Sequence, residues 1–245
     1  DLGFTCPWFN PGNGLLQGRT VIFFGRSNWG SGNFGSDDAD ASIVGGVEDE
    51  ESGQALAGDF DFNGDGLMDI AIGSPDYDGG RGRVAIRPGA TSGWNLLEPF
   101  ASVGGYVSGN ASPTHLGDWI GSGSLGGDGF DDLLLGAPRA NGTRGLVAVV
   151  EGAATIPRLG FGSASSFWVI GNVGTELCGG AAALLDLDGD GVQDLAVGVP
   201  GWDGTGGDQG RVALFYGPLG SVSGGVSPDS AAVFFTGPAT GDFLG

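Results

Sequence analysis

One pattern constrains this chain more than any other: three stretches of its sequence align with one another at a nearly constant spacing. Residues 61–75 read DFNGDGLMDIAIGSP, residues 124–138 read SLGGDGFDDLLLGAP, and residues 186–200 read DLDGDGVQDLAVGVP. The closing aspartates Asp69, Asp132 and Asp194 are 63 and 62 residues apart. The opening DLGFTCP of residues 1–7 matches DLAVGVP at 194–200, as a partial fourth copy. The sequence therefore predicts a fold made of repeated units.

Short runs of β-branched and aromatic residues bounded by glycine surround each copy, and such runs are typical of strands. One run leads into the Asp-rich stretch, as at residues 55–60 and 181–186. The next strand of the unit is the apolar half of that stretch. Two further runs follow, the first at 18–25, 82–89, 145–152 and 210–217, and the second at 41–46, 100–105, 167–171 and 233–237. Apolar stretches with helical periodicity are absent.

Four antiparallel strands per repeat, with a period above 40 residues, are typical of a β-propeller blade. A single four-stranded sheet cannot bury both faces, whereas neighbouring blades bury them for each other. A β-solenoid and a row of separate sandwiches are the alternatives, but a solenoid coil is shorter and a sandwich needs more strands. We expect one all-β propeller region over residues 1–245, with repeats at 1–51 (partial, strands two to four), 52–115, 116–176 and 177–243, and 244–245 opening another.

The Asp-rich stretch has the spacing of a cation-binding loop. In DLDGDGVQD, carboxylates stand at positions 1, 3, 5 and 9, a glycine at position 6 permits a sharp turn, and position 7 can offer its backbone carbonyl. Hard oxygen ligands of this kind suit Ca²⁺ better than Mg²⁺, which demands a near-ideal octahedron. The predicted ligands are Asp186, Asp188, Asp190, Val192 and Asp194 in one loop, and Asp61, Asn63, Asp65, Leu67 and Asp69 in the other.

The middle loop is a weaker candidate. Ser124 and Gly126 replace the carboxylates at positions 1 and 3, which leaves Asp128, the Phe130 carbonyl and Asp132. Asp1 is the last residue of a further, incomplete loop. We therefore expect two calcium sites and count a third as doubtful. These loops are not EF-hands, because position 12 is Ile72 or Val197 instead of glutamate and strands flank both sides. Plain Asp-Gly turns without metal are the alternative.

Composition supports the repeat interpretation and excludes some partners. The 54 glycines are periodic, as many tight turns between short strands require. The net charge of −20 predicts no binding to nucleic acid and no attraction to anionic membranes, and no apolar run is long enough to insert into a bilayer. Cys6 and Cys178 form either one disulfide or two free buried thiols. The single histidine, His115, predicts no triad or histidine-based metal site.

These motifs resemble the FG-GAP repeat of integrin α-subunit propellers and of many bacterial surface proteins. The GAP element reads GSP at 73–75, GAP at 136–138 and GVP at 198–200. The FG element is reduced to Ser52-Gly53, Leu116-Gly117, Cys178-Gly179 and Leu244-Gly245. The calcium loop of the family, D-x-[DN]-x-D-G-x-x-D, is complete at 61–69 and 186–194. The resemblance implies a propeller with calcium loops on one face and a ligand surface on the other.

Loops between the second and third strands carry the candidate ligand-face residues Trp8, Phe9, Tyr77, Arg139, Arg144 and Trp202. Exposed aromatics with arginine suit a protein or glycan contact, although they could simply pack over the strand ends. Family rings usually have seven blades, so we expect either an excerpt of a longer chain or a unit that associates with neighbouring copies of itself. The opening at Asp1 and the end at Gly245, both inside a repeat, agree with either case.

The sequence favours an extracellular or cell-surface calcium-binding module for adhesion or for protein or glycan binding. A structural subunit of a surface fibre or array and an accessory propeller of a larger surface enzyme are the alternatives. The chain itself is not expected to be an enzyme, because no nucleophile, base and orienting residue occur together in its motifs. Its arginine-only basic residues and its glycine and alanine bias point to a bacterial source.

Overall fold

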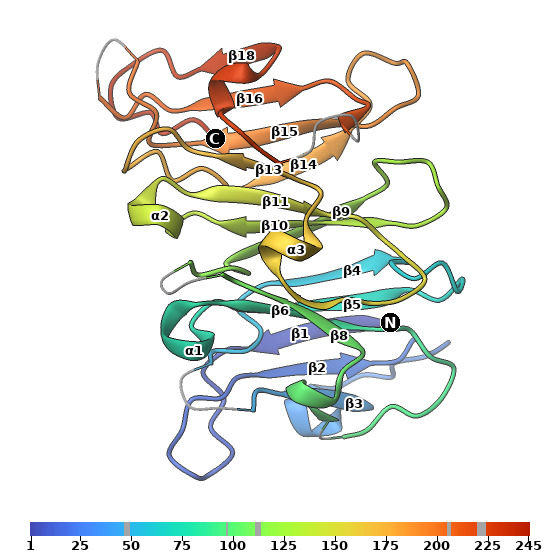
Figure 1. Cartoon of the computed structure of the whole chain (residues 1–245). Coiled ribbons are helices and arrows are strands. Elements are labelled where there is room, and N and C mark those ends of the chain that lie inside the picture. The colour runs from blue at the N-terminus through green and yellow to red at the C-terminus, as the bar shows by residue number, and fades with distance from the viewer. Residues whose placement is uncertain (47–49, 97, 111–113, 205–206, 220–223) are drawn as a thin grey trace.

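The computed structural model describes residues 1–46, 50–96, 98–110, 114–204, 207–219 and 224–245. These residues form four sheets that lie one after another along the molecule (Figure 1). In sheet order, the strands are β1 (Leu2–Cys6), β2 (Arg19–Phe23), β3 (Ala41–Val44) and β7 (Glu98–Pro99); β4 (Leu56–Phe60), β5 (Asp69–Ser74), β6 (Arg83–Arg87), β8 (Gly105–Ser108) and β12 (Arg158–Gly160); β9 (Trp119–Gly123), β10 (Asp132–Ala137), β11 (Leu146–Val150), β13 (Phe167–Ile170) and β17 (Gly224–Val226); and β14 (Ala182–Leu185), β15 (Asp194–Val199), β16 (Arg211–Phe215) and β18 (Val233–Thr236). The predicted all-β class is confirmed.

Each of the last three sheets contains four consecutive antiparallel strands, as the repeat predicts. The first sheet has three, β1 to β3, which agrees with a partial repeat. The outermost strands β7, β12 and β17 were not predicted. Each belongs to the following repeat and pairs in parallel with β3, β8 or β13 of the preceding sheet. Neighbouring repeats are therefore joined by backbone hydrogen bonds as well as by packing.

The core lies between the sheets. Along β10, Leu133 and Leu135 pack with Val84 and other residues of the second sheet, while Leu134 packs with residues of the fourth sheet. Alternate residues of a strand point to opposite faces, so a strand buried on both faces is apolar throughout. Residues 133–137 of β10, LLLGA, meet this requirement, and all of them are buried.

A second type of junction fixes the start of each repeat. Glycines at the foot of the third strand form parallel bridges to the residue before the FG-type glycine: Gly18 to Ser52, Gly82 to Leu116, Gly145 to Cys178 and Gly210 to Leu244. At Gly82, where φ is +76°, a Cβ atom would lie 2.1 Å from the backbone nitrogen of Leu116. Since no side chain fits there, glycine is required where one repeat meets the next.

The prediction of a strand at residues 100–105 is wrong. Phe100–Ser102 forms the 3-10 helix η2, and the strand is β8, Gly105–Ser108. The glycine that closes the fourth strand donates its N–H to the foot of the third strand in every repeat, and this glycine is Gly109 in the second repeat. FASVGG imitates ASIVGG of residues 41–46 in composition but lies five residues too early. Similar short helices, η1 (Ser36–Asp38), α3 (Phe161–Ala164) and η4 (Pro228–Ser230), precede the fourth strands of the other repeats.

The two ends of the sheets carry different connections (Figure 1). The Asp-rich loops join β4 to β5, β9 to β10 and β14 to β15 at one end. Single-turn helices α1 (Tyr77–Gly80) and α2 (Ala140–Thr143) connect the next strand pairs at the other end. Both turns contain left-handed residues, Asp78 at φ 52° and Asn141 at φ 54°, a conformation that aspartate and asparagine tolerate.

The two cysteines are both free. Cys6 is exposed on β1 of the first sheet, whereas Cys178 is buried in the junction between the third and fourth sheets. A disulfide between them is therefore wrong, and so is the alternative of two buried thiols, because Cys6 is accessible. Burial raises the pKa of the Cys178 thiol to about 12. Among the described residues, no helix is both long and apolar enough to cross a membrane.

Candidate metal-binding loops

The last aspartate of each Asp-rich loop holds the loop closed. One carboxylate oxygen accepts the N–H of the second loop residue, and the other accepts the N–H of the glycine that ends the third strand. The three sets are Asp69 with Phe62 and Gly89 at 3.0 and 2.6 Å, Asp132 with Leu125 and Gly152 at 2.6 and 2.8 Å, and Asp194 with Leu187 and Gly217 at 2.9 and 2.9 Å. Asp1 makes the second of these bonds, to Gly25, at 2.6 Å. This two-bond aspartate clamp thus closes each of the three complete Asp-rich loops.

In loop 186–194 the carboxylates converge. Asp186, Asp188 and Asp194 each present an oxygen, and these oxygens lie within 4.8 Å of one another. Asp186 is oriented by the N–H groups of Gly189 and Gly191, at 2.8 and 3.0 Å. Three oxygens at this separation, two of them from exposed side chains, form a donor set that fits a hard cation.

The remaining predicted ligands of this loop are positioned differently. Asp190 lies outside the convergent group, and its Oδ1 accepts the N–H of Val192 at 2.8 Å. Val192, which was predicted to offer its carbonyl, is therefore held at position 7 by Asp190. Asp188 in turn accepts the N–H of Asp190 at 3.1 Å. Asp188 and Asp190 thus form successive Asx turns, in which each side chain fixes the backbone two residues further on.

Loop 61–69 has the same construction. Asp61 accepts the N–H groups of Asp65 and Gly66, at 3.1 and 2.7 Å, and Asp65 accepts that of Leu67 at 2.9 Å. Asn63 also accepts from Asp65 through its Oδ1 and donates its amide to the other Asp65 oxygen at 3.0 Å. The donor set is all oxygen and less charged than that of loop 186–194, because an amide replaces one carboxylate. The chemistry of this donor set suits a hard cation, but among the described residues Asp61, Asp65 and Asp69 do not converge as the three carboxylates of loop 186–194 do.

The middle loop keeps the backbone but not the ligands. Its glycines Gly127 and Gly129 have φ values of 61° and 92°, close to the 70° and 82° of Gly64 and Gly66. Asp128 accepts the N–H of Phe130 at 3.1 Å, and Asp132 makes the clamp. Ser124 and Gly126 supply no carboxylate. The turn geometry is thus independent of the residues that would bind metal.

Burial acts on two of the clamp aspartates. Desolvation raises the pKa of Asp69, opposed by the backbone N–H groups of Gly89 and Phe62 and reinforced by Asp65 and Asp61. The pKa of Asp132 is raised for the same first reason, opposed by Leu125 and Gly152. A buried carboxylate close to other carboxylates is costly to ionise, and a bound cation would relieve that cost.

Most candidate ligand-face residues at the opposite end pack within the protein. The Arg83 guanidinium lies 3.8 Å from the centre of the Tyr77 ring, and Arg19 and Arg211 lie 5.2 and 4.8 Å from the rings of Phe9 and Trp202. Trp8 differs, since 68% of it is exposed.

The arginines of the middle repeat have internal partners as well. Arg139 forms a two-bond ion pair with Asp118, at 3.0 and 3.2 Å, and Arg144 donates to the carbonyl of Gly171 at 2.7 Å. Burial raises the pKa of Asp118, opposed first by its bond to Arg139. His115 lies 3.1 Å from Asp76 in the same region.

Sequence reasoning missed the residues that precede two of the clamp aspartates, Asp132 and Asp194. Asp131 accepts the N–H of Asp61 at 2.8 Å, and Gln193 accepts the N–H of Ser124 at 3.0 Å. Both bonds join loops of adjacent repeats. A polar residue at the same loop position, Asp131 and Gln193, was the available signal, although the first loop has Met68 there.

Comparison with known proteins agrees with this geometry. The FG-GAP repeat model matches residues 52–86 and 179–215, and these stretches contain loops 61–69 and 186–194. The chain therefore contains FG-GAP repeats. The middle loop, which lacks two of the ligands, lies between the two matched FG-GAP stretches.

Two integrin α-chains are similar to this chain. Integrin alpha-PS2 of Drosophila melanogaster is 30% identical over 179 residues, which cover 66% of this chain and 11% of the relative. Integrin alpha-4 of Xenopus laevis is 30% identical over 142 residues, which cover 56% of this chain and 13% of the relative. The matched region is therefore a small part of each of these relatives.

Proposed function

We propose that this chain is a section of an extracellular β-propeller that binds calcium structurally and serves adhesion through a protein or glycan ligand. The observation that carries the calcium assignment is the convergence of Asp186, Asp188 and Asp194 within 4.8 Å. Bound cations would neutralise carboxylates that repel one another in a chain of net charge −20. Loops of extracellular modules bind calcium at about 10⁻⁴ to 10⁻³ M, so they are filled outside a cell.

The propeller assignment is supported by the way the sheets succeed one another. Each of the first three sheets packs an apolar face on the next sheet and pairs with a parallel strand of the repeat that follows. The outer faces at both ends of the row are also apolar: Leu2 and Phe4 of the first sheet are 50% and 54% exposed, and Phe235 of the last is 55% exposed. Further sheets of the same kind would cover these faces and continue the ring.

The same exposed faces favour a second candidate, a fibre or array in which copies of the chain stack end to end. A ring completed within one chain predicts a constant particle mass at all concentrations. An array predicts a mass that rises with concentration, which light scattering would detect. We place the ligand surface at the end opposite the calcium loops, where 68% of Trp8 is exposed. Integrin homology favours binding over catalysis as the role of the chain.

Thermal melts in EDTA and in millimolar CaCl₂ test the calcium assignment. Calcium should raise Tm of the wild type, because a ligand that binds only the folded state stabilises it by about 1.4 kcal/mol at ten times Kd. Asp188→Ala should lose much of this rise. Asp128→Ala is the matched control, because Asp128 accepts a backbone N–H at the same 3.1 Å in the loop that lacks two ligands. Equal calcium shifts in both variants, or no shift in the wild type, would overturn the assignment.

A further inference from the structure

The Asp-rich loops of adjacent repeats are bonded to each other, and the bonds join the second sheet to the third. Asp131 accepts the N–H of Asp61 through its Oδ2 at 2.8 Å, and its own N–H donates to the carbonyl of Asp61 at 2.9 Å. The N–H of Ala153 reaches the carbonyl of Phe62 at 2.9 Å. Both the N–H and the carbonyl of Asp61, the first residue of loop 61–69, are therefore hydrogen-bonded to Asp131, which is far away in sequence.

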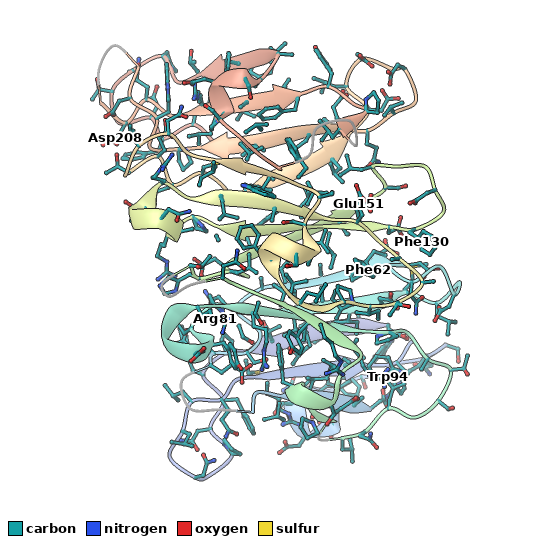
Figure 2. All side chains as sticks on the ribbon, in the orientation of Figure 1. Phe62, Arg81, Trp94, Phe130, Glu151 and Asp208 are labelled. Carbon is teal, nitrogen blue, oxygen red and sulfur yellow. The ribbon has the colours of Figure 1, made fainter. Side chains whose placement is uncertain are left out.

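An aromatic ring supports the same contact. A Cβ atom on Gly64 would lie 2.8 Å from a ring carbon of Phe130, so the ring lies directly against this glycine. Figure 2 shows Phe62 and Phe130 together at the loop end of their sheets. Gly64 has a φ of +70°, a conformation that the turn needs between Asn63 and Asp65. The following loop therefore fixes both the start and the middle of loop 61–69.

The equivalent contact one repeat later has a different chemistry. Gln193, at the loop position of Asp131, accepts the N–H of Ser124 at 3.0 Å. The hydrogen bond is the same, but the acceptor is a neutral amide next to the loop that lacks two carboxylates. A charged acceptor lies next to loop 61–69, which has a full set of candidate ligands. The charged interloop acceptor thus lies beside the loop with the full set of candidate ligands, and the neutral one lies beside the loop that lacks two of them.

We propose that Asp131 is a positioning residue for cation binding by loop 61–69, an inference that rests on the proposed calcium function. Its hydrogen bond fixes the backbone of Asp61, whose carboxylate is the first candidate ligand. Its negative charge adds to the field at the loop without occupying a ligand position. Groups that orient metal ligands from outside the coordination sphere typically change affinity by about ten- to a hundredfold when removed. Calcium binding by one repeat thereby depends on the repeat that follows.

The experiment is a calcium titration of the full chain followed by ¹⁵N NMR at two amides. The N–H of Gly66 donates to the Asp61 carboxylate at 2.7 Å, and the N–H of Gly191 donates to the Asp186 carboxylate at 3.0 Å. Each amide therefore reports calcium binding in its own loop. Asp131→Ala should raise the calcium midpoint at Gly66 by about tenfold and leave the midpoint at Gly191 unchanged. Asp131→Asn, which keeps an acceptor oxygen but not the charge, should fall between wild type and Asp131→Ala.

Gln193→Ala is the matched control, because it removes the same interloop bond from the loop without a full ligand set. It should leave the Gly66 midpoint at the wild-type value. A wild-type Gly66 amide that does not respond to calcium would overturn the calcium function of that loop. A Gly66 midpoint that responds but is the same in wild type and Asp131→Ala would overturn only the role of Asp131. Equal shifts at Gly66 and Gly191 would also overturn it, since they would indicate general destabilisation. If Asp131→Ala does not fold, Asp131→Asn is tested in its place, and the same outcomes decide the role of Asp131.

Discussion

Loops 186–194 and 124–132 differ at four of their nine positions. The two loops nevertheless share the same turn. Both turn through two glycines of positive φ, and both are closed by an aspartate that accepts two backbone N–H groups. Loop 186–194 adds carboxylates at positions 1 and 3, where loop 124–132 has Ser124 and Gly126. The comparison separates two roles that the motif combines: the last aspartate builds the turn, and the earlier ones gather charge.

The separation explains why the clamp aspartate persists in a loop that has lost other acidic residues. Asp132 satisfies two N–H groups that the fold places away from water, and a buried donor without an acceptor is costly. Asp128 is exposed and accepts one N–H within its own turn. A residue at position 9 is therefore constrained by the fold, whereas residues at positions 1 and 3 are constrained by the ligand.

The largest effect is expected from breaking the clamp in the loop with the fewest ligands. Asp132→Ala leaves the N–H groups of Leu125 and Gly152 without their acceptor and should lower the free energy of unfolding by roughly 2 kcal/mol or more. The loss should be the same in EDTA and in calcium, as measured by urea denaturation. Asp128→Ala, a change at an exposed residue of the same loop, should cost less than about 0.5 kcal/mol. Equal losses in the two variants would refute the separation of roles.

A smaller effect is expected from restoring the missing ligands. Gly126 does not have a positive φ, and a Cβ atom there would meet only the Asp128 carboxylate at 3.5 Å or more, so the backbone accepts a side chain. Ser124→Asp with Gly126→Asp should raise the calcium stoichiometry from two to three by isothermal titration calorimetry. At ten times Kd the added site should stabilise the chain by about 1.4 kcal/mol. Ser124→Asp alone is the control, with one ligand position still vacant. A stoichiometry of two in the double variant would show that spacing alone is insufficient.

Much of this architecture could be predicted because the repeat aligns residues that do the same work. The Asp-Gly loops, the glycine-bounded strands and the all-β class all follow from local sequence. The parallel strands β7, β12 and β17 could not be predicted, because they are two or three residues long and pair with a different repeat. The strand at 100–105 was misplaced because FASVGG has the composition of a strand, while the hydrogen bond that sets the register is made by Gly109.

The candidate site was less predictable than the fold. Spacing indicated Asp186, Asp188 and Asp194, and the structure brings these together. It gave no indication that Asp190 would lie outside the group, because the direction of a side chain in an Asx turn depends on which backbone N–H it accepts. Asp131 and Tyr77 could not be assigned partners from sequence either. Asp131 contacts Asp61 because two sheets pack together, and Tyr77 contacts Arg83 because the turn α1 lies against the start of β6.

The smallest effect concerns the titration of the two clamp carboxyls, Asp69 and Asp132. Burial raises the pKa of both above the ordinary value of 3.8. A carboxyl with a raised pKa in the folded state favours folding when protonated, so its contribution to stability falls as pH rises through the raised pKa. In EDTA, ¹³C NMR of the carboxyl carbons should therefore give midpoints above 3.8 for both residues. Calcium should lower the midpoint of Asp69, which has ligands beside it, and leave that of Asp132 unchanged, because a nearby cation favours the ionised form. A parallel fall at Asp132 would mean that the middle loop also binds calcium and that the two loops differ in affinity alone.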